Sequence, residues 1–182
     1  MSTALHKPVA IAKPAAGEHI EYFSKYIQLV SGDDARPALA RQAGETLRLL
    51  EGVSEAQGLH RYQSGKWSVK EVVGHITDTE RVFAYRALRF GRGDETPLAG
   101  FDENQYVPQA NSDLRTMHSL RAELSAVRAA TLSLAESFDE TALQRSGPAN
   151  AHPVSVRALF WIIAGHELHH VALLRDRYGL KG

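Results

Sequence analysis

Apolar side chains recur along most of the chain at intervals of three or four residues, the spacing of one face of an α-helix. No stretch shows the sustained apolar–polar alternation of a half-buried β-strand. The pattern predicts a short N-terminal helix over 18–29 and four long helices over 34–50, 68–90, 113–138 and 154–178. Four long amphipathic helices in one small chain indicate an all-α four-helix bundle, because each helix must bury its apolar face against the others.

Capping residues and glycines mark the predicted helix ends. Ser68 and Glu71 form a capping box at the start of the second long helix, and Gly91 follows its end. Residues 91–112 then connect the second and third long helices without a periodicity of their own. Connections of that length in a compact domain are uncommon and often functional. Residues 146–153 (SGPANAHP) are expected to form a turn-rich break before the last helix.

The composition fits a single domain with its own core. The chain has 182 residues, of which 43% are hydrophobic and 23% charged. We expect an N-terminal tail over 1–15 and one domain over 16–182. The 21 basic residues balance the 21 acidic ones. This balance argues against a dedicated nucleic-acid binder, because phosphate neutralisation supplies most of the affinity of such proteins.

The sequence also gives no sign of membrane insertion or export. It contains no run of 18 or more apolar residues, so no transmembrane helix is expected. Pro8 and Pro14 interrupt the N-terminal stretch, which lacks the apolar centre of a secretion signal. We therefore expect a cytoplasmic protein that acts on a small molecule, without a nucleic-acid or membrane partner. Whether it forms a homodimer stays open.

Histidine is the residue that carries the candidate chemistry. The chain has nine histidines and no cysteine, so thiolate metal sites and an intrinsic cysteine nucleophile are excluded. His166 and His170 lie four residues apart on the apolar stripe of the last predicted helix, and two imidazoles so placed can bind one metal ion inside the bundle. A surface pair or a hydrogen-bonded core pair is the alternative. Beside apolar neighbours, however, each imidazole without a hydrogen-bond partner would cost roughly 1–3 kcal/mol of folding free energy.

A third metal ligand must come from another helix. His75 is the best candidate, because it lies in the middle of the second long helix beside Gly74, where a missing side chain permits close packing. The letters HELHH at 166–170 also fit the zincin pattern H-E-x-x-H. No histidine or glutamate follows His170 to complete such a site. We therefore reject a metalloprotease and expect an open three-histidine site of the catalytic type.

Other polar residues are candidates for orienting the imidazoles or contacting substrate. They are Asp78, Glu80, Asp102, Glu167 and His169. Four arginines on the second long helix (Arg81, Arg86, Arg89 and Arg92) form either an anion clamp or a solvated face, and we favour the solvated face.

Three segments together resemble the DinB/YfiT-like superfamily. They are GKWSVKEVVGHITDTERVFAYRAL over 65–88, GFDENQYV in the following connection, and GHELHH in the final helix. The resemblance covers residues 18–178. It implies a four-helix bundle with a long connection between helices two and three. It also implies a metal held by one histidine from the second long helix and two from the last, which correspond to His75, His166 and His170.

The activities implied by this resemblance are less uniform than the fold. Some members are similar to transferases that join bacillithiol or mycothiol to an electrophile, and others resemble isomerases or hydrolases. We expect a divalent ion, with zinc or nickel first and iron or manganese as alternatives. A metal-dependent transferase of a low-molecular-weight thiol is the expected function. A metal-dependent hydrolase of a small amide or ester, and a non-catalytic metal-binding stress protein, are the alternatives.

Overall fold

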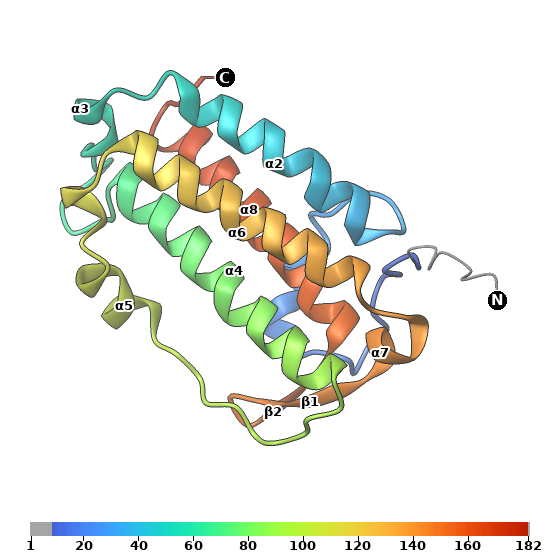
Figure 1. The fold of residues 1–182 in the computed structure, drawn as a ribbon. Helices are drawn as coiled ribbons and strands as arrows, with labels where there is room; N and C mark the ends of the chain where they lie inside the picture. The colour runs from blue at the N-terminus through green and yellow to red at the C-terminus, as the bar shows by residue number, and fades with distance from the viewer. Residues whose placement is uncertain (1–8, 182) are drawn as a thin grey trace.

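A computed structural model of the chain describes residues 9–181, and its framework is four long helices packed side by side (Figure 1). These helices are α2 (Ala35–Glu51), α4 (Val69–Gly91), α6 (Met117–Glu136) and α8 (Val156–Asp176). Helix α4 packs on α6 and α8, and α2 packs on the same two helices. The helices α2 and α4 are therefore diagonal neighbours. The prediction of a four-helix bundle is confirmed.

Shorter elements link the long helices and lie at both ends of the bundle and along its side (Figure 1). They are η1 (Glu21–Phe23), α1 (Ser24–Ile27), α3 (Glu55–Gly58), α5 (Glu103–Gln109), η2 (Ser112–Leu114), α7 (Glu140–Gln144), β1 (Ser146–Ala149) and β2 (His152–Ser155). Helices α4 and α6 run in the same direction, so the connection between them returns along the whole bundle (Figure 1). The long connection between the second and third long helices is thus confirmed. Among residues 9–181, no helix combines the length and apolarity needed to cross a membrane.

Side-chain caps explain where the long helices begin. Ser68 accepts a hydrogen bond from the Glu71 backbone N–H, and the Glu71 side chain accepts one from the Ser68 N–H, as the predicted capping box requires. Asp34 caps α2, Thr116 caps α6 and Ser155 caps α8 in the same way with one side-chain oxygen each. Because these caps satisfy N–H groups that have no partner inside the helix, they fix the helix starts to within a residue or two of the prediction, except at α6.

The structure corrects three local predictions. Residues 91–112 contain a short helix, α5, although no periodicity marks it. Helix α6 begins at Met117 and not at residue 113 as predicted, because Leu114 belongs to a 3₁₀ turn and is 85% exposed. The segment predicted as a turn-rich break forms a small antiparallel hairpin of β1 and β2. Its two turn residues, Asn150 and Ala151, have φ angles of 52° and 63°, which turn the chain within two residues.

The N-terminal segment is partly outside the described residues. The first eight residues of the predicted tail are not described, nor is Gly182. Within the rest of the tail, the side chain of Ile11 is fully buried, and its backbone N–H donates to Asp34 Oδ1 at 2.9 Å. The carbonyl of Ile11 accepts from Trp161 Nε1 at 2.9 Å, which anchors this segment to α8.

Two apolar clusters fill the bundle, and a layer of buried polar side chains separates them. One cluster surrounds Phe90, Phe138 and Trp161, and the other surrounds Leu50 and Leu120. All four long helices contribute to the polar layer between the clusters, with Gln42, Thr46, Glu80, Arg128, Thr131, His166, Glu167 and His170. Buried polar groups destabilise a fold unless they are paired, so this layer is where a functional site is expected.

Candidate metal centre

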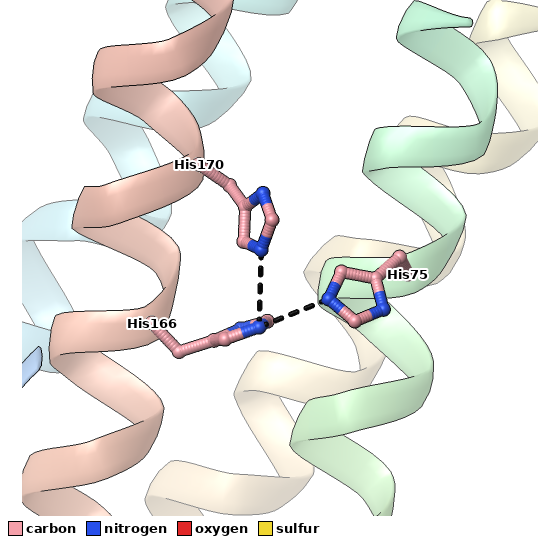
Figure 2. A group of neighbouring side chains, drawn as sticks. All are labelled: His75, His166 and His170. Carbon is pink, nitrogen blue, oxygen red and sulfur yellow. Dashed lines mark hydrogen bonds between the residues drawn. The ribbon is translucent and has the colours of Figure 1, made fainter. Parts of the chain in front are cut away.

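Three histidine rings converge where α4 lies against α8 (Figure 2). The Nε2 atom of His166 lies 3.0 Å from Nε2 of His75 and 3.1 Å from Nε2 of His170. All three side chains are buried. His166 and His170 project from the same face of α8 because four residues make about one helical turn, and His75 faces them from the neighbouring helix. The structure therefore brings together the three histidines selected from the sequence.

The electrostatics of the cluster keep all three rings neutral. Burial is the main cause that lowers the pKa of His75 to about 4 and that of His170 to about 3, and neighbouring imidazoles add to the effect. Burial also lowers the pKa of His166 well below its usual value, with His170 as the next cause. Neutral imidazoles carry a free lone pair at physiological pH, and this is the form that binds a metal ion.

The ring geometry fits a metal ion better than a set of hydrogen bonds. The three ligand atoms lie within 4.8 Å of one another. Nitrogen atoms about 2.0–2.1 Å from a tetrahedral zinc ion are about 3.3 Å apart, close to the two observed separations. The buried Nδ1 of His170 has no hydrogen-bond partner among the described residues. Three lone pairs directed at one point are what a bound cation would stabilise, because neutral rings that all present lone pairs repel one another.

Several side chains hold these rings in place. The hydroxyl oxygen of Thr79 lies 3.4 Å from His75 Nδ1, one helical turn away on α4. The indole of Trp67 packs on the His75 ring, with 4.8 Å between ring centroids. Tyr26 places its ring edge-on to both His166 and His169. Such contacts restrict ring rotation and keep the Nε2 atoms directed at one another.

A chamber of about 540 Å³ opens beside the three histidines. Aromatic and aliphatic side chains form more than half of its lining and polar side chains the rest, a combination typical of a small-molecule site. The residues that line it are Ile20, Tyr22, Phe23, Tyr26, Trp67, His75, Thr79, Phe83, Arg86, Gly100, Phe101, Glu103, Ala149, Asn150, His152, Pro153, Val154, Leu159, His166, His169 and His170. The chamber therefore lies between α1, α4, α8, the hairpin and the connection before α5.

The acidic candidates for orienting the imidazoles have other partners. Asp78 accepts a hydrogen bond from Arg81 at 3.2 Å, and Asp102 caps α5 by accepting from the Asn104 N–H. Glu80 and Glu167 are both buried and bond to Arg128. His169, the remaining candidate, lines the chamber next to the cluster but outside the group of three converging rings.

Arg128 is the centre of a buried ionic network on the bundle axis. Its Nε and Nη2 atoms donate to the two carboxylate oxygens of Glu80 at 2.8 and 2.9 Å, and Nη2 also donates to Glu167 at 2.6 Å. Its Nη1 atom donates to the Leu39 carbonyl at 2.9 Å. Burial opposes the charge on Arg128, but the two carboxylates outweigh it and hold the pKa above its usual value. This network contacts all four long helices.

Two buried arginines differ from what the sequence predicted. Arg86 was expected on a solvated face, and that expectation is wrong, because its side chain is only 6% exposed and lines the chamber. Arg128 was not singled out at all. A signal for it was present, because Arg128 lies on the apolar face of its helix, four residues after Leu124 and three before Thr131. A charged residue at such a position must find a buried partner.

Comparison with known proteins places this arrangement in a family context. The profile of the DinB superfamily matches residues 38–174. A protein of Oceanobacillus iheyensis, whose name describes it provisionally as a metal-dependent hydrolase, is 26% identical over 134 residues, which cover 72% of this chain and 75% of that protein.

Two solved structures share the fold. YfiT from Bacillus subtilis, described as a probable metal-dependent hydrolase with an unusual four-helix bundle topology, matches with a TM-score of 0.71 and 20% identity. That match covers 97% of this chain and 99% of YfiT. A mycothiol-dependent maleylpyruvate isomerase matches with a TM-score of 0.60 and 18% identity, over 82% of this chain and 59% of the isomerase. At these identities the two matches show a common fold and not a common activity.

Proposed function

This chain belongs to the DinB superfamily, and we propose that it is a metal-dependent enzyme that transfers a low-molecular-weight thiol, of the bacillithiol type, to an electrophilic small molecule. The observation that carries the proposal is the convergence of three neutral, buried imidazoles on one wall of a chamber of about 540 Å³. A chamber of that size can enclose a small organic molecule next to the three ring nitrogens.

The three histidines would hold a divalent ion. Zinc or nickel is the first candidate and iron or manganese the alternative, because all of these ions accept imidazole. Three protein ligands leave a coordination position for a ligand from the chamber. When bound, the ion would supply a positive charge that holds a thiol as its thiolate near neutral pH. Thr79 and Trp67 would keep the His75 ring oriented through the contacts described above.

In the proposed reaction the thiol sulfur forms a bond to an electrophilic carbon of the substrate. The leaving group departs from that carbon with the electron pair of the broken bond, and the thiol proton passes to water. The chain has no cysteine, so no protein thiol competes for the electrophile. The aromatic side chains of Trp67, Phe83 and Phe101 line the chamber and give the reacting atoms an apolar surrounding.

Hydrolysis of a small amide or ester is the second candidate function. It is favoured by the names of the Oceanobacillus iheyensis relative and of YfiT, both described as metal-dependent hydrolases. Among the described lining residues Glu103 supplies one carboxylate, which would accept a proton from an attacking water. The mycothiol-dependent maleylpyruvate isomerase, which has the same fold, favours the thiol reaction instead.

The first experiment measures the metal. Protein purified without a metal-affinity tag is subjected to elemental analysis, and we expect one divalent ion per chain. His166→Ala should contain none, because the central ring of the three is removed. His152→Ala is the matched control, since this histidine lines the chamber but is outside the three converging rings. A wild-type protein that takes up no divalent ion even after dialysis against zinc or nickel contradicts the proposal.

The second experiment separates the two reactions. Metal-loaded protein receives chlorobimane as electrophile with bacillithiol, mycothiol or glutathione in turn, and conjugation is compared with the rate without enzyme. We expect metal-dependent conjugation that falls by orders of magnitude in His166→Ala, because thiolate formation and positioning are both lost. Turnover of nitrophenyl esters or anilides without a thiol, together with no conjugation, would establish the hydrolase instead. Inactivity in both assays with the metal bound would favour the non-catalytic role.

A further inference from the structure

Arg86 is a buried cation without an acidic partner. Its side chain is 6% exposed, and no carboxylate of the described residues forms an ion pair with it. Burial alone lowers its pKa, and no neighbouring acid offsets that effect. The other deeply buried arginine, Arg128, has two carboxylates around it. Because an unpaired buried charge is costly, Arg86 has a reason other than stability to occupy this position.

The guanidinium of Arg86 is held in place but only partly used. Its Nη2 atom donates to the Ala99 carbonyl at 3.0 Å, and no hydrogen bond from Nε or Nη1 to another described residue is present. The guanidinium carbon lies 5.4 Å from the Phe83 ring centroid and 5.9 Å from that of Phe101. The aromatic rings and one carbonyl thus fix the group, and donors remain free toward the chamber that Arg86 lines.

Arg86 and the histidine cluster lie on one stripe of α4. Eleven residues separate His75 from Arg86, which corresponds to a rotation of about 20° and a translation of about 16 Å along the helix. Thr79 and Phe83 lie between them on the same stripe and line the same chamber. The chamber therefore has a metal-binding wall toward the start of α4, an aromatic middle and a cationic wall toward its end.

We propose that Arg86 binds a carboxylate of the ligand, so that the enzyme acts on organic acids whose apolar body lies along Phe83 and Phe101 and whose reactive end reaches the three histidines. The position of the reactive end rests on the proposed function, whereas carboxylate binding at Arg86 does not. The free Nη1 atom and the second N–H of Nη2 together match a carboxylate in charge and shape.

The other charged group of the chamber does not compete for Arg86. Glu103 is the only carboxylate among the described lining residues. Its charge contributes to the raised pKa of Tyr26, where burial is the main cause, so it lies nearer to that tyrosine. It has no corresponding effect on Arg86. Arg86 is therefore available for an anion from outside.

A binding experiment without metal or thiol tests this proposal independently of activity. Protein kept in EDTA at pH 8 is titrated by calorimetry with 4-phenylbutyrate and with its neutral analogue 4-phenylbutyramide. EDTA removes any metal ion that could bind the carboxylate in place of Arg86. Because a hydrogen bond to a charged group contributes about 1.5–3 kcal/mol, we expect the acid to bind about tenfold to a hundredfold more tightly than the amide.

Variants of Arg86 show whether this residue provides the selectivity. Arg86→Gln should bind the acid and the amide equally, and Arg86→Lys should retain part of the preference. Arg89→Gln is the matched control, because Arg89 lies on the same helix, pairs with Asp94 and does not line the chamber. It should keep the full preference. If Arg86 only packs against the aromatic rings, Arg86→Gln will weaken both probes alike and leave the ratio unchanged, which overturns the proposal.

The same titration identifies which reactant carries the carboxylate. Glutathione has two carboxylates, and mycothiol has none. Weaker glutathione binding in Arg86→Gln, with mycothiol unaffected, assigns the subsite to the thiol. If Arg86→Gln loses its preference for phenylbutyrate over the amide but still binds glutathione as wild type does, the carboxylate subsite belongs to the electrophile. If the affinity for neither glutathione nor phenylbutyrate changes in Arg86→Gln, the proposal fails even when the metal and the transfer activity are both found.

Discussion

Replacing Arg128 by methionine tests how the polar layer of the bundle is stabilised. The substitution Arg128→Met keeps most of the side-chain volume but removes every donor. Two hydrogen bonds to Glu80, one to Glu167 and one to the Leu39 carbonyl are lost. Both carboxylates belong to side chains that are only 2% exposed, so water cannot replace the lost donors.

The expected loss of stability is large because two buried carboxylates are left unpaired. Breaking a buried ion pair by removing one partner costs roughly 3–5 kcal/mol. In a domain of this length each kcal/mol lowers the melting temperature by about 2–4 °C, so Tm should fall by roughly 6–20 °C. An exposed pair gives the scale for comparison. Arg41 lies 3.8 Å from Glu45 on the surface of α2, and Arg41→Met should cost at most about 1 kcal/mol.

Urea denaturation followed by circular dichroism measures these differences. The decisive comparison is with the triple variant Arg128→Met, Glu80→Gln, Glu167→Gln, which removes the two negative charges as well. If uncompensated charge is the cause, the triple variant should recover a large part of the lost free energy of unfolding. A triple variant as unstable as Arg128→Met, or an Arg128→Met loss no larger than that of Arg41→Met, would refute this reasoning.

Three further predictions concern single positions. His170→Ala should abolish binding of zinc in equilibrium dialysis whereas His169→Ala should leave it nearly unchanged, because only the His170 ring joins the converging group; the opposite order would contradict the ligand set. Burial raises the pKa of Glu18, but hydrogen bonds led by that from Arg157 outweigh it and lower the pKa to about 2, below the value of about 4.5 in the unfolded chain. The stability that this ion pair contributes is therefore complete above pH 4.5 and is lost as the pH falls toward 2. In urea titrations, wild type should lose more stability than Glu18→Gln between pH 5 and pH 3. Parallel plots of unfolding free energy against pH for the two proteins would exclude the effect. Ala151→Gly should raise Tm by about 1–4 °C, because a φ of 63° strains alanine by about 1 kcal/mol relative to glycine. An unchanged or lower Tm would show that the turn is not strained.

Local patterns explain why the sequence predicted the framework and the histidine cluster. The period of apolar residues and the capping box at Ser68 depend only on neighbours within one or two turns. The spacing of His166 and His170 is local in the same sense, since four residues on a helix always share a face. Only the pairing with His75 needed a second helix, and the apolar stripe around it showed which face of that helix turns inward.

The site beyond the cluster depends on segments that are distant in the sequence. From the sequence, Arg86 resembles Arg81 and Arg89 on the polar face of α4, but the segment containing Ala99 and Phe101 covers it. That segment is held by the hairpin, where Leu98 donates to the Pro148 carbonyl at 2.9 Å and accepts from the Asn150 N–H at 2.9 Å. No helical period or glycine turn announces this pairing, because Asn150 and Ala151 form a turn for which glycine is the usual signal.

By itself the sequence therefore determined the helices, their inward faces and the three histidines, because each follows from contacts within a few residues of chain. Only the tertiary structure decided which charged side chains are buried and what they meet there. It pairs Arg128 with Glu80 and Glu167 on the bundle axis and, among residues 9–181, leaves Arg86 at the chamber without an ion-pair partner. The physical reason is that burial of a side chain depends on every segment that packs over it, whereas periodicity reports only the helix to which it belongs.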